Sequence, residues 1–236
     1  MSATRFYFGS VDGTNPVSPA FATASWEQTG EATRRKLYFK NTFDGVLSAL
    51  TSKQVTVPIT TTQDILNVQF VSDPIPAQSL IGNFSMVVRC SENATSNNAH
   101  LAGILRVCSQ DGGTFRGTLW SSFTTISEFA LHASQATRII AAVAITPLTT
   151  QPGDRLVLEV GVRANAPSAS GNAQQRFGNS AVAGSPGVFD DFALTTALTT
   201  DLNPWAELAQ DLRAMQFENF KSVRYGTGMS GTERLR

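Results

Sequence analysis

The chain has 236 residues, a formal net charge of +0 and a charged fraction of only 15%. A neutral chain has no overall basic field to recruit nucleic acid, and no apolar run approaches the ~20 residues of a membrane span. The length suits one large β domain, since sandwiches often run to ~200–250 residues as one unit. Ser, Thr, Asn and Ala take the place of charges, which is typical of a surface that packs against neighbours and equally of a solvated β surface.

Runs with strand-like alternation recur through most of the chain, and turn signals separate them. The clearest lies at 154–164, where Leu156 and Leu158 are predicted to face a core while Glu159 faces water. The longest apolar run, 139–145, is predicted as a buried strand. Together these runs predict an all-β fold, an antiparallel β-sandwich of jelly-roll type. The predicted strands lie near residues 4–8, 21–27, 34–39, 54–60, 66–72, 80–90, 101–108, 114–120, 125–131, 137–146, 154–164 and 187–194.

The apolar patterns also predict which strands pair. An antiparallel hairpin of 82–90 with 101–108 sets apolar residues opposite one another along a single face, and so does a hairpin of 137–146 with 154–164. One buried face is the condition that fixes strand register. Two independent hairpins that meet this condition support the predicted sandwich.

The first of these hairpins separates the two cysteines. Cys90 and Cys108 would lie roughly 23 Å apart along the ladder at ~3.3 Å per residue, whereas a disulfide needs Cα atoms within about 7 Å. We therefore predict two free, buried thiols, which fits synthesis in the cytoplasm. The first ten residues lack an apolar core of signal-peptide length, so no signal sequence is expected.

Two stretches depart from the strand pattern. Residues 164–187 are rich in Ala, Ser, Gly and Asn, which predicts a long loop that either contacts a partner or is solvated. Residues 1–200 are assigned to the sandwich and 201–236 to a C-terminal arm with a short helix and a basic tail. Asn203 would cap that helix, and an extended conformation is the alternative. The apolar residues at helical spacing are Trp205, Leu208, Leu212 and Met215.

Residues that could carry catalysis are sparse. His100 and His132 have no second His or Cys at ligand spacing, which favours structural roles. Asp190 and Asp191 are the only adjacent carboxylate pair, and neighbouring strand residues face opposite ways. A glycoside hydrolase or esterase would need a carboxylate pair or a nucleophile in a cleft. We expect no enzyme activity, no catalytic residues, no metal site and no cofactor.

Three groups of residues could bind a ligand or a partner. Arg34, Arg35 and Lys36 form the densest basic cluster. On a strand, Arg34 and Lys36 would share one face while Arg35 lies opposite, and a solvated strand face is expected, with contact to nucleic acid or an acidic neighbour as the alternative. Turns at 12–15 and 41–45 offer oxygen ligands for calcium, although ordinary turn chemistry explains the same residues. Five aromatic residues could stack on sugars but are more often core residues in a sandwich: Tyr7, Trp26, Tyr38, Trp120 and Trp205.

Several separated segments resemble a pattern in tailed-bacteriophage structural proteins. They are ASWEQTGEATRRKLYF (24–39), PGDRLVLEVGVRAN (152–165), the following RFGNSAVAG, and DLNPWAEL (201–208). The resemblance implies a jelly-roll module on the virion, as head decoration, minor capsid, or tail or fibre component, and it implies no catalytic residues. This chain departs from the pattern after the Pro-Trp segment, where it continues into a tail.

These observations predict a non-enzymatic structural subunit of a bacteriophage particle, located in the virion and made in the bacterial cytoplasm. Its expected partners are other virion proteins and copies of itself, with no membrane and no specific nucleic acid. The predicted contact residues are an apolar anchor, Trp205, Leu208 and Leu212, and polar contacts on the tail, Arg224, Tyr225 and Arg234. The alternative function is a carbohydrate-binding module that recognises a host surface glycan.

Overall fold

The computed structural model describes residues 3–9, 26–39, 51–58, 61–124, 127–132, 136–177 and 203–212. These residues form strands and connections, with one 3-10 turn, η2 (Thr95–Asn97), so the predicted all-β class is confirmed. The strands are β1 (Thr4–Phe8), β2 (Gln28–Phe39), β3 (Thr51–Val57), β4 (Gln63–Ser72), β5 (Ser79–Leu80), β6 (Asn83–Glu92), β7 (Ala99–Cys108), β8 (Phe115–Ser122), β9 (Ala136–Ala144), β10 (Leu148–Thr149), β11 (Arg155–Ala164), β12 (Gly171–Phe177) and β13 (Trp205–Leu208).

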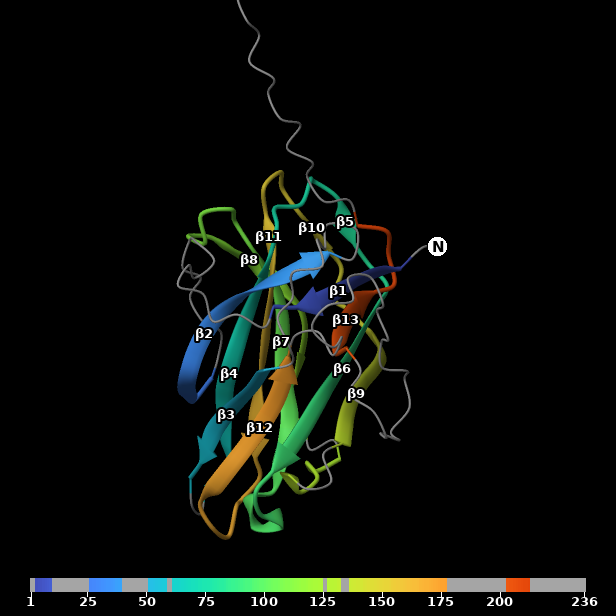
Figure 1. Cartoon of the computed structure of the whole chain (residues 1–236). Coiled ribbons are helices and arrows are strands. Elements are labelled where there is room, and N and C mark those ends of the chain that lie inside the picture. Colours follow the sequence, from blue (N-terminus) through green and yellow to red (C-terminus); the bar gives the residue numbers. More distant parts are fainter. Residues whose placement is uncertain are drawn as a thin grey trace, which may run out of the picture.

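Hydrogen bonding joins most strands in one order, β3-β12-β6-β13-β1-β2-β4-β11-β7-β8, and β9 pairs with β6 outside this path. The sheet folds into two layers, so that β12 and β6 cross in front of β11 and β7 in Figure 1. β2 joins the layers, because its last residues pair with β1 while its earlier part pairs with β4. The β2–β4 pair is parallel, which makes the sheet mixed rather than purely antiparallel. The short strands β5 and β10 form a separate two-stranded sheet.

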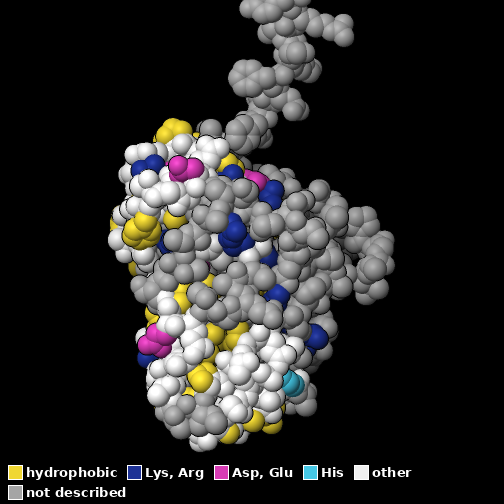
Figure 2. All heavy atoms as spheres, turned by 90° about the vertical axis from the view of Figure 1, so that its left-hand side faces the viewer, with side chains coloured by type: hydrophobic (Ala, Val, Ile, Leu, Met, Phe, Trp, Pro, Cys, Tyr) yellow, Lys and Arg dark blue, Asp and Glu magenta, His cyan; other side chains and the backbone are white. Residues whose placement is uncertain are grey.

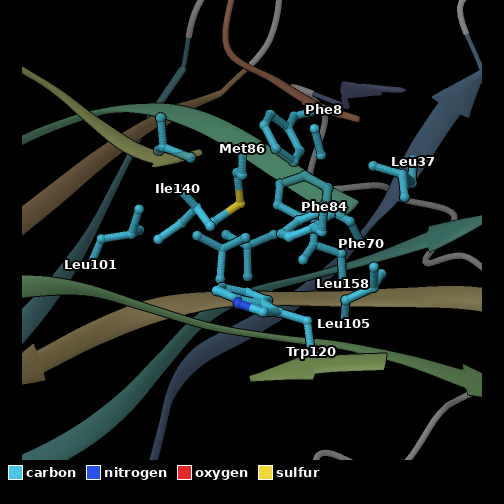
Figure 3. Close-up of a cluster of buried hydrophobic side chains, with 14 of the residues drawn as sticks. Phe8, Leu37, Phe70, Phe84, Met86, Leu101, Leu105, Trp120, Ile140 and Leu158 are labelled. Atoms are coloured by element: carbon cyan, nitrogen blue, oxygen red, sulfur yellow. The ribbon is translucent and has the colours of Figure 1, made fainter. Parts of the chain in front are cut away.

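The main core lies between the two layers. Phe84 of β6 contacts Trp120 of β8 with ring centroids 4.9 Å apart, and Phe70 of β4 contacts Phe177 of β12 at 4.9 Å. In Figure 3, Phe84 lies in the middle of this cluster, with Phe8 above it and Trp120 below it. Apolar residues from both layers therefore remove each other from water, which is the dominant stabilising term of such a fold.

Both predicted hairpins are wrong. β6 pairs with β9, β12 and β13, while β7 pairs with β8 and β11. In the same way β9 pairs with β6 and β11 pairs with β4 and β7. Each predicted partner lies in the opposite layer, so the matched apolar faces meet across the core instead of along a shared edge. The two cysteines are free and buried, as predicted, but opposite layers rather than ladder distance separate them.

The predicted C-terminal helix is also wrong. Trp205–Leu208 form β13, which pairs with β6 on one side and β1 on the other. Trp205 faces a small outer cluster with Tyr7 and Val87, whereas Leu208 faces the main core. Because β13 buries Trp205 on one face and Ala206 and Leu208 on the other, its apolar residues do not alternate as on a strand with one wet face, and so short an apolar pattern does not distinguish strand from helix. The sandwich therefore continues beyond residue 200, and 213–236 lie outside the described residues.

Two further expectations are corrected. Part of the stretch 164–187 is the strand β12, whose inward residues Ala173 and Phe177 are buried. Arg35 lies opposite Arg34 and Lys36, as expected, but its face is buried rather than solvated, because only 1% of Arg35 is exposed. Its guanidinium donates to the Gly9 carbonyl at 3.2 Å and lies over the Phe177 ring.

Candidate interaction groove

A groove of about 520 Å³ opens between β8 and β9. Residues from 119 to 124 form one wall and residues from 139 to 146 form the other, and no lining residue is charged. Trp120 and aliphatic side chains provide the apolar part, and Ser121, Ser122 and Thr124 provide hydroxyls. At one end the Thr146 N–H donates to the Leu119 carbonyl at 2.7 Å, which ties the two walls together. Such a lining suits an uncharged protein segment.

The wall that β9 forms is shaped by a β-bulge. Phe84 pairs with Val143 but Met86 pairs with Ile140, so β9 has one extra residue in this interval. Ala142 has a φ of 48°, and its N–H donates to Ser85 Oγ at 3.0 Å. A regular strand would turn alternate residues inward, whereas here all of residues 141–144 are exposed. The prediction of a buried strand over 139–145 is therefore wrong for these four positions.

The bulge is held in place by the contacts around it. A left-handed φ costs a non-glycine residue roughly 1–2 kcal/mol, so the surrounding contacts must hold Ala142 in place. Bulges of this kind are concentrated at sheet edges and next to sites, where they redirect side chains. Here the bulge turns small apolar side chains outward beside the groove.

Charged side chains are sparse on the described surface. On the face shown in Figure 2, Lys, Arg, Asp and Glu lie singly or in small groups among uncharged atoms. This distribution agrees with the charged fraction of 15%. An uncharged contact surface can be buried without the cost of desolvating charges.

A fully buried carboxylate, Glu159, lies on the outer face of β11. Its Oε1 accepts hydrogen bonds from Arg106 Nη2 at 2.7 Å and from Gln69 Nε2 at 2.9 Å. Its Oε2 accepts one from the Trp26 indole N–H at 2.7 Å. The prediction that Glu159 faces water is wrong, because these side chains cover it. With both oxygens bonded to fixed donors, Glu159 links β4, β7 and β11 on the side away from the core.

A second buried carboxyl, Glu92, faces Glu128 of the segment 127–132. The Oε1 atoms of both residues are buried and have no donor among the described residues, whereas Glu92 Oε2 accepts the Ala99 N–H at 3.1 Å. Two facing carboxyls can hydrogen-bond only when one carries a proton. Burial is the largest cause that raises the pKa of Glu92, to about 7. The hydrogen bond from the Ala99 N–H is the second largest and lowers it, the hydrogen bond and charge of Glu128 raise it further, and the charge of Arg138 lowers it slightly.

The Glu92 carboxyl should make stability fall as pH rises. Unfolding returns its pKa to an ordinary value of 4.5, so its contribution is complete below that pH and is lost as pH rises through about 7. Glu92→Gln mimics the protonated acid. The difference in unfolding free energy between this variant and the wild type should therefore shift in favour of the variant by on the order of 1–2 kcal/mol from pH 5 to pH 8. Urea unfolding at both pH values measures this difference. Glu207→Gln, which removes a partly exposed, ion-paired carboxylate, is the control, and an equal response of the two variants would contradict the prediction.

The predicted apolar anchor is not on the surface. Trp205, Leu208 and Leu212 are 1%, 1% and 4% exposed and pack within the chain's own fold. The Arg5 guanidinium lies 4.0 Å above the Trp205 ring and pairs with Glu207. These three side chains stabilise the sandwich and offer no anchor for a partner. The tail residues Arg224, Tyr225 and Arg234 lie outside the described residues.

The aromatic residues weighed as sugar-stacking rings are mostly internal. Tyr7, Trp120 and Trp205 are buried. Trp26 is half-buried, contacts Phe123 edge-on with centroids 5.0 Å apart and donates to Glu159. Tyr38 is half-buried, and the Lys36 ammonium lies 5.0 Å from its ring centroid.

The histidines have ordinary surroundings. His132 Nδ1 lies 2.9 Å from Ser91 Oγ, and His100 is 8% exposed. Among the described residues, no group of three or more His, Cys, Asp or Glu is arranged to hold a metal ion. The turns considered for calcium, 12–15 and 41–45, and the pair Asp190–Asp191 lie outside the described residues. No helix in the described part of the chain has the length and hydropathy needed to cross a membrane.

No protein-family model and no curated protein matches the chain. Two crystal structures of a CocE/NonD family hydrolase from Staphylococcus aureus are similar in part. One has a TM-score of 0.38 at 12% identity and covers 56% of this chain and 31% of the hydrolase. The other has a TM-score of 0.34 at 12% identity and covers 73% and 34%. This chain thus spans about a third of the hydrolase, and a similarity this low carries no information about its activity.

Proposed function

We propose that the chain is a non-enzymatic structural subunit of a bacteriophage particle, in the head as decoration or minor capsid protein, or in the tail. It acts through contacts with other virion proteins and with copies of itself. The observation that carries this proposal is the uncharged groove between β8 and β9, with the exposed residues 141–144 beside it. The assembly is proposed to be a phage particle because the segments at 24–39, 152–165 and 201–208 resemble tailed-phage structural proteins.

The sandwich suits a scaffold for such contacts. Its described elements are joined by long-range pairing, and ion pairs such as Arg106–Glu159 fix neighbouring strands to one another. A contact surface on rigid strands loses little conformational freedom on binding, which leaves more of the contact energy for assembly. In this role the protein is made in the bacterial cytoplasm and acts in the virion.

The test is the composition of purified particles. Particles of a phage that encodes this chain should be isolated on a density gradient and analysed by quantitative mass spectrometry. We expect the chain in the particle fraction in a fixed ratio to the major capsid or tail-tube protein, and retained after a high-salt wash. A chain that is abundant in the infected-cell lysate but absent from washed particles would contradict the proposed role.

A further inference from the structure

Residues 127–132 cross the place where β6 ends and β7 begins. The Phe129 N–H donates to the carbonyl of Ala99, the first residue of β7, at 2.7 Å. The N–H of Glu92, the last residue of β6, donates to the Ala130 carbonyl at 2.8 Å. The Phe129 side chain is 3% exposed and belongs to the main core. We call residues 127–132 the strap, because they join the two strands and close this end of the core.

Two side chains hold the ends of the strap. The Arg138 guanidinium of β9 donates to the carbonyls of Ser127 and Glu128. At the other end, His132 Nδ1 lies 2.9 Å from Ser91 Oγ. Neither contact requires a carboxyl group to gain or lose a proton, so both act at any pH at which Arg138 is charged.

The contact at the middle of the strap does depend on a proton. Glu92 is 0% exposed and faces Glu128 of the strap, and the Oε1 atoms of both are buried with no donor among the described residues. The charged groups that act on Glu92 there are Glu128 from the strap and Arg138 from β9, while β7 contributes the uncharged Ala99 N–H. With one shared proton the two carboxyls can hydrogen-bond. Without it, two negative charges face one Arg138 charge in a buried place, and they repel each other.

We propose that the strap is a pH-sensitive closure, which is shut while Glu92 and Glu128 share a proton and opens locally when both are ionised. Opening moves the two carboxyls into water and withdraws Phe129 from the core. The inference concerns the chain alone and does not depend on the virion role.

The pH range follows from the proton balance. Burial raises the pKa of Glu92 from 4.5 to about 7 in the closed strap, and in the open strap this carboxyl returns to an ordinary value. Between these values the closed form binds more protons than the open form, so opening becomes more frequent as pH rises and levels off above about 7. The pH therefore controls the exposure of apolar core atoms at this end of the sandwich.

The test is amide hydrogen exchange of the full-length chain at pH 5 and pH 8, followed by mass spectrometry. Exchange is expressed as protection factors, which removes the intrinsic effect of pH on the exchange rate. We expect the protection of peptides that span the strap to fall at least about tenfold from pH 5 to pH 8. At pH 8 it should not change in about 1 M urea, whereas the protection of β11 should fall, because local opening exposes little surface and global unfolding exposes much.

Three variants locate the cause. Glu92→Gln and Glu128→Gln each replace the shared proton by an amide N–H, and each should reduce the fall in strap protection to less than about threefold. Glu207→Gln is the matched control, because its carboxylate pairs with Arg5 away from the strap, and it should keep the full fall. Circular dichroism establishes that all three variants are folded.

Three results would overturn the inference. The first is strap protection that is equal at the two pH values in the wild type. The second is a fall that persists in Glu128→Gln, since burial of Glu92 alone would then explain it. The third is a strap whose protection at pH 8 depends on urea as strongly as that of β11, since the strap would then open only when the whole chain unfolds. Each of these results leaves the particle composition to decide the virion role.

Discussion

A chain ending at residue 202 is expected not to fold, whereas a chain ending at Leu212 should unfold in the same cooperative thermal transition as the full-length protein. The shorter chain lacks β13, which lies between β6 and β1. It loses the buried side chains Trp205 and Leu208, worth roughly 1.5–3 kcal/mol each, and it leaves the backbone groups of two strands without partners. Against a total stability of about 5–15 kcal/mol, this loss is decisive.

Thermal unfolding followed by circular dichroism distinguishes the two truncations. The chain ending at Leu212 is the control for the removal of the tail, because it keeps every described strand. If the chain ending at residue 202 unfolded cooperatively near the wild-type temperature, β13 would be dispensable and its place in the sheet would be wrong. The experiment also means that any study of the tail should begin its deletion after Leu212.

Replacing Arg106 by Met should destabilise the protein by about 3–5 kcal/mol, because it leaves the buried Glu159 carboxylate without its cationic partner. Arg106 Nη2 lies 2.7 Å from Glu159 Oε1, and the two side chains are 5% and 0% exposed. Gln69 and Trp26 would still donate to the carboxylate, but neither carries a charge. Urea denaturation at pH 7 measures the loss.

The matched control is Arg163→Met, which removes a similar ion pair at a more exposed place. Arg163 Nη1 lies 3.2 Å from Asp64 Oδ2, with side chains 27% and 18% exposed, and such pairs contribute below about 1 kcal/mol. A combined Arg106→Met and Glu159→Gln variant should recover more than half of the loss. If Arg106→Met costs no more than Arg163→Met, the pair does not hold Glu159 as described.

The fold class could be predicted from the sequence because strand alternation depends on local burial. Strand pairing could not, since apolar faces look the same whether two strands share an edge or face each other across a core. The matched patterns of 82–90 and 101–108 arise in the second way. The helix prediction from Trp205 and Leu208 failed for a related reason, because these two side chains are buried on opposite faces of β13.

The polar sites were missed for another reason. Glu159 alternates with Leu158 and Val160 as a solvated residue would, and only tertiary packing places Trp26 and Arg106 over it. Glu92 and Glu128 are far apart in the sequence, so a search for adjacent carboxylates passes over them. In the groove, the run 139–145 has the composition of a buried strand, and the bulge that exposes part of it has no clear sequence signal beyond its alanines.

The position of β13 also determines when the protein can fold. Thr4 pairs with Leu208, and its Oγ1 accepts a hydrogen bond from Leu212, 208 residues further along the chain. Closing so long a loop is slow, because its entropy must be lost before the contact forms. During synthesis β1 therefore keeps one unpaired edge until Trp205–Leu208 has left the ribosome. The described sandwich is complete only after β13 has been translated, and until then the unpaired edge of β1 favours aggregation of the nascent chain.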